Sequence, residues 1–424
     1  MQADLTESVQ ASIRPGEMLD VYYAGETSTQ KQAYPAIVNT RFIQQFTNLG
    51  AGSSQFVISP QGGVSDIILQ FALPASTGSN YTSAALSSGW GYALINRVSV
   101  RYGSSAQYFW SGAQMWLENV LDCENNTKVD ALLQLGGNAA TGAACGGQLA
   151  SVYLKLPHNS PRAAGKPLPF PSDLLVQPIV ITVELLSPTQ ILTNQAAQSG
   201  YNSGPTALAS AQLQVKQEML TDSSDLLARR VDMNTHAYTF PLPYFAQQET
   251  SVAVSSDASN SVNSVNLTGF RAGEVKQILL WLTPSGQGQG TPGSGNYQPL
   301  AWQVMSDIQL TYNGEIFNRF DAGSFQLWGA VEQEKTPVVN GLVLQTFGSV
   351  ASTTPVSYYV KLDLAQVMMP TARESKLVHG KPILNAVVQI SFRAPAANTA
   401  YTLRAMYLYN ASLLCSRGSA EYVF

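Results

Sequence analysis

Charged side chains are scarce in this sequence. Asp, Glu, Lys and Arg make up 12% of its 424 residues, and the formal net charge at pH 7 is -4. Because a soluble domain usually carries about 25% charged residues, Ser, Thr, Asn, Gln and backbone atoms must cover most of this surface. No cluster of Lys and Arg is interleaved with aromatic residues, so we expect no direct, sequence-specific binding of nucleic acid. A polar surface with few charges suits packing against neighbouring molecules.

Cysteine and histidine are also rare. The chain has three cysteines, which are Cys123, Cys145 and Cys415. Their odd number and wide spacing predict neither a disulfide framework nor a zinc site, and favour synthesis in a reducing compartment. No two histidines have the His-x-His spacing of a metal-binding strand, so we expect no metal site and no cofactor. The three histidines are His158, His236 and His379.

Long hydrophobic runs are missing as well. No stretch approaches the roughly 18 apolar residues of a membrane span. Residues 1–7 lack the basic start and the apolar core of a secretory signal peptide. We therefore expect a protein that is synthesised in the cytoplasm and not secreted.

One glycine motif requires separate consideration. Residues 288–293 match the Gly-x-Gly-x-x-Gly pattern of dinucleotide-binding proteins and follow a predicted strand. That site needs the third glycine inside a helix whose N-terminus faces the pyrophosphate. Pro292 and Pro299 forbid such a helix, so the segment is predicted to be a surface loop.

Five acidic residues are candidates for hydrolytic chemistry. Two carboxylates that face each other across a cleft can cleave a glycosidic bond. Two of the candidates follow tryptophans at nearly equivalent positions, and three lie at the ends of predicted strands. They are Glu118, Glu332, Asp66, Asp307 and Asp321. Solvated acids on helix or strand edges are the favoured interpretation, so no catalytic residue is predicted.

One stretch of the sequence occurs twice. Residues 97–103, 108–109 and 114–116 are echoed by residues 307–314, 316–317 and 326–328. Each copy predicts an alternating strand, a tight glycine turn, an aromatic strand and a short amphipathic helix with a tryptophan. Ser111 is placed to cap the first helix. Trp116 and Trp328 could be sugar-stacking platforms, but helical spacing favours packing of each helix on its own half.

Three further pairs of segments follow in the same order in both halves. Residues 68–74 match 278–284, residues 153–156 match 359–362, and residues 165–168 match 380–383. Such a collinear series indicates a duplicated unit. With about eight strands in each copy and only one recurring helix, we predict an all-β fold of two tandem antiparallel jelly-roll sandwiches.

The expected domain organisation follows from this duplication. Residues 1–30 are predicted to form an N-terminal arm, 31–221 the first jelly roll, 222–235 a linker helix and 236–424 the second jelly roll. In the first half we expect strands at 41–47, 55–59, 65–73, 150–156, 179–186 and 209–219, with an irregular loop at 136–147. In the second half we expect strands at 238–242, 250–254, 275–282 and 302–312.

The end of the chain resembles a known family. The relevant residues are Tyr409, Asn410, Leu413, Leu414, Ser416, Gly418, Ala420 and Tyr422. This series is similar to the ending of capsid proteins of large eukaryotic DNA viruses, although Ser419 and Glu421 stand where further small or apolar residues occur. With the doubled architecture, the chain resembles the double jelly-roll major capsid proteins of tailless icosahedral double-stranded DNA viruses. A phage, a virophage or another small relative stays open as its branch.

The resemblance implies a structural function in the virion shell. It implies a homotrimer whose six jelly rolls form a pseudo-hexagonal capsomer, with the N-terminal arm directed inward. The implied partners are neighbouring capsomers, vertex (penton) proteins, and minor capsid proteins or an internal membrane below the shell. It also implies synthesis in the cytoplasm of a host cell and no enzymatic activity.

Two other functions remain open at this point. One is a two-jelly-roll glycan hydrolase of the glycoamidase type, with paired acids and tryptophans in a cleft between the halves. The other is a carbohydrate-binding adhesin that uses Tyr- and Trp-bearing loops without catalysis. The hydrolase is expected to carry a secretion signal, and residues 1–7 do not resemble one.

Overall fold

The structure is a computed structural model, and it describes most of residues 37–220 and the strands of residues 237–423. The described residues are 37–76, 81, 84–86, 89–121, 131–132, 134–154, 170–194, 204–220, 237–252, 262–267, 275–284, 306–312, 315–320, 359–363, 388–393 and 401–423. The predicted arm at 1–30 and the predicted linker helix at 222–235 lie outside these residues. The domain boundaries therefore stay predictions.

Residues 37–220 form two main antiparallel sheets, which we call the first sandwich. One sheet has the strand order β1 (Ile37–Gln45), β12 (Ser210–Leu220), β3 (Gly63–Ala72) and β8 (Leu149–Tyr153), with β9 (Phe170–Pro171) also paired to β3. The other has the order β2 (Gly52–Ile58), β10 (Ile179–Leu185), β5 (Ile95–Tyr102) and β6 (Tyr108–Trp110).

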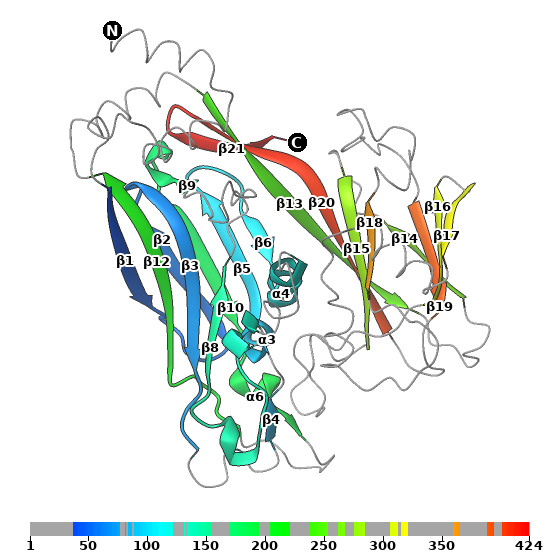
Figure 1. Ribbon diagram of the computed structural model, residues 1–424, viewed down its shortest axis with the longest axis horizontal. Helices are drawn as coiled ribbons and strands as arrows, with labels where there is room; N and C mark the ends of the chain where they lie inside the picture. Colours follow the sequence, from blue (N-terminus) through cyan, green and yellow to red (C-terminus); the bar gives the residue numbers. More distant parts are fainter. Residues whose placement is uncertain are drawn as a thin grey trace.

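Short elements lie between these strands. A small sheet has the order β11 (Thr193–Asn194), β4 (Ala84–Leu86) and β7 (Ala140–Thr141). The helical elements are α3 (Trp90–Leu94), α4 (Gly112–Leu121), η2 (Gly142–Cys145), η4 (Ser172–Leu174) and α6 (Pro188–Ile191). Figure 1 shows α3, α6 and β4 gathered at one end of the first sandwich.

Residues 237–423 form two further antiparallel sheets, which we call the second sandwich. One has the order β13 (Ala237–Val252), β20 (Tyr401–Ser416), β15 (Val275–Pro284) and β18 (Tyr359–Asp363), with β21 (Ser419–Val423) also paired to β20. The other has the order β14 (Val262–Leu267), β19 (Val388–Arg393), β16 (Ser306–Tyr312) and β17 (Glu315–Phe320).

The two sandwiches have the same topology. When the principal strands of each sandwich are numbered in chain order, both give one sheet of order 1-8-3-6 and a second of order 2-7-4-5. This is the strand order of a jelly roll, in which consecutive strands alternate between two sheets except for the hairpin formed by strands 4 and 5. The prediction of two tandem antiparallel jelly rolls is therefore confirmed.

The predicted strands of the first half match the observed ones closely, but the second half departs at one place. Segment 238–242 and residues 250–252 of segment 250–254, expected as two strands, belong to the single strand β13 of 16 residues. Pro241 and Pro243 lie inside it, although proline cannot donate a ladder hydrogen bond. Proline is tolerated here because β13 is an edge strand, which among the described strands pairs with β20 on one side only. The missing N–H donors therefore cost few hydrogen bonds of the sheet.

Two of the matched segment pairs disagree with each other by three residues. With Ile68 and Ile278 as equivalent residues, Ile68 pairs with Tyr153, whereas Ile278 pairs with Leu362 and not with Tyr359. Strands β8 and β18 do occupy the same place in their sheets. The buried residues of β3 include Ile67, Leu69 and Phe71, whereas those of β15 include Leu280 and Leu282, so matching Ile68 with Ile278 sets an outward position against an inward one.

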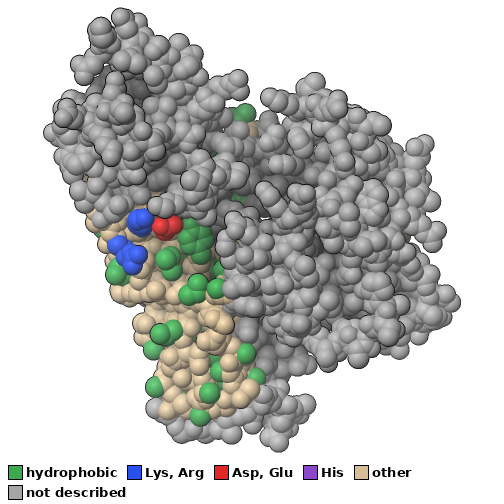
Figure 2. Space-filling view, in the orientation of Figure 1, with side chains coloured by type: hydrophobic (Ala, Val, Ile, Leu, Met, Phe, Trp, Pro, Cys, Tyr) green, Lys and Arg blue, Asp and Glu red, His purple; other side chains and the backbone are tan. Residues whose placement is uncertain are grey.

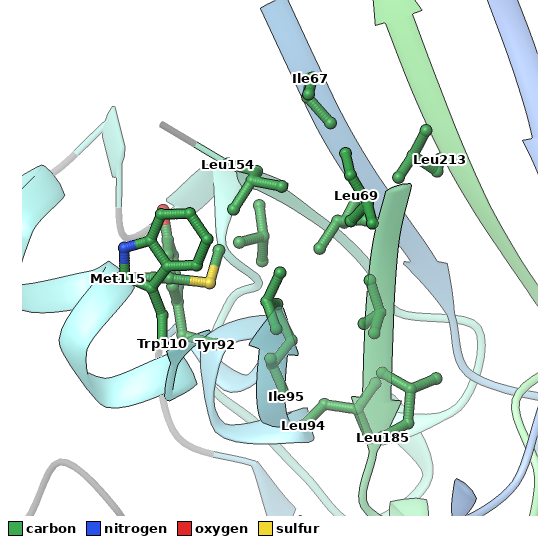
Figure 3. Packing of buried hydrophobic residues seen from close by; sticks show 14 of the residues in the cluster. Ile67, Leu69, Tyr92, Leu94, Ile95, Trp110, Met115, Leu154, Leu185 and Leu213 are labelled. Carbon is green, nitrogen blue, oxygen red and sulfur yellow. The ribbon is translucent and has the colours of Figure 1, made fainter. Parts of the chain in front are cut away.

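The interior of the first sandwich is large and rich in aromatic residues. Alternate residues of β3, namely Ile67, Leu69 and Phe71, point inward and are almost fully buried. Figure 3 shows Ile67 and Leu69 facing the same interior as Tyr92 of α3 and Met115 of α4. Burial of each such side chain contributes about 1.5–3 kcal/mol relative to leaving it exposed. Helices α3 and α4 therefore contribute side chains to the same core as the two sheets.

Candidate functional site: the repeated motif and the exposed faces

The repeated motif of the first half folds as the sequence predicts. Strand β5 leads to Gly103, whose φ of 54° is left-handed, and then to β6. The turn closes when the N–H of Ser105 donates to the Tyr102 carbonyl at 2.9 Å and the N–H of Tyr102 donates to Ser105 Oγ at 3.0 Å. Val98 then pairs with Trp110 across β5 and β6. The hairpin delivers the chain directly into α4.

Helix α4 begins with a reciprocal cap. The N–H of Gln114 donates to Ser111 Oγ at 3.2 Å, and the N–H of Ser111 donates to Gln114 Oε1 at 2.8 Å. This arrangement satisfies backbone donors that the first turn of a helix leaves open. The predicted cap at Ser111 is therefore confirmed.

Trp116 is part of the core. Its side chain is 1% exposed and belongs to the same buried cluster as Met115 and Tyr92. Asn119, one turn further along α4, donates to Tyr92 Oη at 3.0 Å and to the Tyr153 carbonyl at 3.1 Å. The prediction that Trp116 packs the helix on its sandwich is confirmed, and an indole buried in this way cannot stack on a sugar from solvent. Trp328 lies outside the described residues.

The second copy of the motif shares its hairpin. Strands β16 and β17 pair with Tyr312 opposite Glu315, so two residues connect them. The predicted strand and the aromatic strand after it are therefore confirmed as a pair, while residues 313–314 between them lie outside the described residues. The expected helix at 326–328 lies outside the described residues.

Asp66 is the only candidate acid whose side chain the structure describes, and it is engaged by its neighbours. Tyr153 Oη donates to Asp66 Oδ1 at 3.2 Å, and Lys216 Nζ lies 3.8 Å from Asp66 Oδ2. These residues stand on the adjacent strands β8, β3 and β12. Asp66 therefore links neighbouring strands on the outer face of the sheet, which agrees with the favoured interpretation of a surface acid without a catalytic function. The side chains of Glu118, Glu332, Asp307 and Asp321 lie outside the described residues.

The remaining candidates for chemistry fall outside the described part of the chain. This holds for the glycine motif at 288–293, for Cys123 and for the three histidines, His158, His236 and His379. Among the residues that the structure does describe, no group of three or more His, Cys, Asp or Glu side chains could hold a metal ion.

The two described cysteines are buried and free. Cys145 Sγ donates to the Ala84 carbonyl at 3.8 Å, and burial raises its pKa. Burial also raises the pKa of Cys415 to about 12. Both thiols therefore stay protonated near neutral pH and act as small apolar side chains.

The outer face of the sheet that contains β12 carries a row of amides. Gln212 Nε2 and Gln214 Nε2 both donate to Gln70 Oε1, at 2.6 and 2.7 Å, and Gln45 Nε2 donates to Gln212 Oε1 at 3.4 Å. Figure 2 shows that the described surface in this orientation has few charged side chains and scattered apolar ones. The polar surface with few charges that the composition predicts is present on these strands.

Apolar side chains are exposed on two neighbouring edge strands. Phe42 and Ile43 of β1 are 38% and 55% exposed, and Val57 of β2 is 49% exposed. β1 and β2 end their sheet orders, and Gln44 Nε2 of β1 donates to the Val57 carbonyl at 2.9 Å. Exposed apolar residues on strand edges suit contact with another protein surface.

One packing element was not predicted from the sequence. Helix α3 places Trp90 and Tyr92 in the core, and its start is held by hydrogen bonds from the N–H groups of Gly89 and Gly91 to the carbonyls of Gly137 and Gly136, both 2.8 Å. A side chain at Gly137 would meet Trp90 Nε1 at 2.2 Å. The sequence does contain a signal for this contact, namely Gly136 and Gly137 in one segment and Trp90 and Tyr92 in another. A backbone can approach an aromatic ring this closely only where the Cβ is missing.

No helix described in the structure is long and apolar enough to cross a membrane.

Comparisons with known proteins agree on the fold. A chain of the PBCV-1 virus capsid matches with a TM-score of 0.60 at 13% identity, covering 94% of this chain and 99% of that one. The Faustovirus major capsid protein matches with a TM-score of 0.57 at 9% identity, covering 92% of each chain. The mavirus major capsid protein matches with a TM-score of 0.52 at 10% identity, covering 95% and 94%. No protein-family model matches the sequence, and no curated protein is significantly similar to it. The predicted resemblance to double jelly-roll major capsid proteins is confirmed at the level of fold.

Proposed function

We propose that this chain is the major capsid protein of an icosahedral virus. The observation that carries the proposal is the repetition of one jelly-roll topology within one chain. Three copies of such a chain supply six similar sandwiches, so a homotrimer acquires a pseudo-hexagonal outline that can tile a shell. The three structural neighbours named above, all of them viral capsid proteins, support the same function and do not favour a glycan hydrolase.

The surface chemistry supports an assembly function. A shell must form through many modest contacts so that misplaced subunits can dissociate. The amide row around Gln70 and the exposed Phe42, Ile43 and Val57 offer such contacts without strong charge. The trimer interface is expected to bury on the order of 2,000 Å² or more, and contacts between capsomers less.

The partners follow from this function. They are two further copies within the capsomer, neighbouring capsomers, vertex (penton) proteins, and minor capsid proteins or an internal membrane beneath the shell. The protein is located in the virion after synthesis in the cytoplasm of a host cell. It acts as a structural protein without catalysis, and its first 30 residues are an arm that contacts these partners.

Electron microscopy of the purified full-length chain tests the proposal. Class averages are expected to show compact particles with a pseudo-hexagonal outline. Isolated two-lobed particles at every concentration would contradict it. A variant that lacks residues 1–25 serves as the matched control for the arm. This variant is expected to form the same particles but fewer shells. Loss of the particles themselves would show that residues 1–25 are needed for the fold or the trimer and are not a separate arm.

A further inference from the structure

The end of the chain packs on the first sandwich. Strand β20 belongs to the second sandwich, but its last residues and β21 form a hairpin that reaches the other half of the molecule (Figure 1). Leu413, Cys415 and Ala420 of this hairpin are at most 4% exposed and belong to the buried cluster of the first sandwich. Tyr422 packs against the same cluster. The first sandwich therefore completes its core with residues from the end of the chain.

The contact lies against the turn of the first repeated motif. Tyr102, just before that turn, packs edge-on against Phe170 with ring centroids 5.2 Å apart. Burial raises the pKa of Tyr102, and the neighbouring Tyr422 and Cys415 raise it further. Tyr102 and Cys415 belong to the same buried cluster, and Tyr422 packs against it.

Three hydrogen bonds join the two surfaces. The N–H of Ala420 donates to Ser104 Oγ at 3.2 Å, and Ser104 Oγ donates to the Ala420 carbonyl at 3.4 Å. The N–H of Val176 donates to the Gly418 carbonyl at 2.9 Å. Backbone groups on both sides thus find their partners in the other half of the chain, which fixes one position of the hairpin.

The turn of the hairpin is shaped for this close approach. Arg417 and Gly418 connect β20 to β21, and both have positive φ, 50° and 77°. Two such residues make the tight turn that suits a twisted hairpin. A side chain at Gly418 would also meet Val176 Cγ2 at 2.2 Å. Glycine is needed here for the backbone conformation and for contact with Val176.

The partners are far apart in sequence. Ser104 and Ala420 are separated by 316 residues. We propose that the hairpin β20–β21 is a clasp that holds the two sandwiches in the one orientation that permits self-association. The self-association part of this inference rests on the proposed capsid function, whereas the clasp itself can be measured in the single chain.

The first test is Gly418→Ala in the full-length protein. Its matched control is Gly147→Ala, because Gly147 has a similar φ of 72° but nothing within 4 Å of an added Cβ. Hydrogen exchange is followed in peptides that cover residues 172–178, which lie on the first sandwich. Gly418→Ala is expected to speed exchange there about tenfold, since the bond from Val176 opens, and the control is expected to leave it unchanged. Adding Val176→Ala removes Cγ2, so the double variant is expected to recover part of the protection.

A milder pair keeps the test decisive if Gly418→Ala fails to fold. Ser104→Ala removes both side-chain bonds to Ala420. Ser264→Ala removes a similar 2.7 Å bond, to Ser391, inside the second sandwich. The first is expected to speed exchange at 418–423 by about threefold, and the second to leave it unchanged. Unchanged exchange at both 172–178 and 418–423 in the Ser104 and Gly418 variants would overturn the clasp.

Light scattering on the same samples tests the link to self-association. The trimer fraction is expected to fall at least about threefold in Gly418→Ala and to be unchanged in Gly147→Ala. A clasp that opens while the trimer fraction stays the same would overturn this link. If the unaltered chain is monomeric, the proposed capsid function fails, but the exchange experiment still decides whether the clasp exists.

Discussion

The first and last strands of the two sandwiches show how the halves have diverged. In the first sandwich β1 pairs with β12 over nine residues, whereas in the second β13 pairs with β20 over sixteen. Both pairs occupy the same place in their sheets. The extra length of the second pair leads to β21 and to contact with the first sandwich (Figure 1). Duplication therefore accounts for the fold of each half, and lengthening of one strand pair accounts for the contact between them.

The largest expected loss of stability comes from Trp116, which packs within the first sandwich. Trp116→Ala removes a buried indole from the first sandwich and is expected to lower the free energy of unfolding by about 3–5 kcal/mol. Leu149→Ala is the control, because Leu149 is 69% exposed and its loss should change stability by less than about 0.5 kcal/mol. Chemical denaturation measures both. Equal stability of Trp116→Ala and the unaltered chain would contradict the packing assignment.

A second substitution asks which half a residue stabilises. Leu413 lies in β20 of the second sandwich but is buried in the cluster of the first, so Leu413→Ala is expected to cost about 2–5 kcal/mol and to loosen the first sandwich. Leu280→Ala in β15, equally buried, is the matched control and is expected to loosen the second sandwich. Hydrogen exchange resolved by peptide distinguishes them. If Leu413→Ala spared peptides of 95–102, the halves would be independent.

Alkaline pH is expected to weaken the contact between the halves. Burial raises the pKa of Cys415 from 9.0 to about 12, and that of Tyr102 well above its ordinary 10.0. The unfolded chain therefore loses these protons first as the pH rises, so the stabilisation is complete below pH 9.0 and declines as the pH approaches about 12. Stability measured against pH in Cys415→Ala should decline less steeply. An identical slope in both proteins would contradict the assignment to Cys415.

The smallest effect is expected on the exposed face of the first sandwich. Arg97 forms a salt bridge with Glu184 and lies over the ring of Phe109, 5.0 Å from its centroid. Because Arg97 is about half exposed, solvent screens the pair, and Arg97→Ala is expected to cost less than about 1 kcal/mol. A thermal melt at low and high salt measures this, with Glu184→Gln as the control. A loss of stability as large as that of Trp116→Ala would contradict the expectation that solvent screens the Arg97–Glu184 pair.

The sequence supports the topology well because its signals are local. Alternating apolar residues mark strands such as β3 and β10, and the repeated motif identifies β5, β6 and α4 in the first half and β16 and β17 in the second. Helix α3 escaped prediction because five residues make too short a window for a helical period. The continuity of strand β13 is hard to foresee because it contains Pro241 and Pro243, which only its edge position makes tolerable.

The candidate site was less accessible from the sequence. Trp116 could be assigned to packing because its helix and its spacing are local features. The contact of Ser104 with Ala420 spans 316 residues and leaves no periodic signal in either segment. The ending at Gly418 and Tyr422 was recognised only as a family resemblance, and its contact with the first sandwich appears only once the chain is folded.

The mass of the purified full-length chain in solution tests the proposed function most directly. Size-exclusion chromatography with light scattering is expected to give a stable species of about 136 kDa, three times the 45.5 kDa of one chain, since three duplicated chains make a six-sandwich ring. A species of 45.5 kDa that persists at high protein concentration would contradict the capsid function.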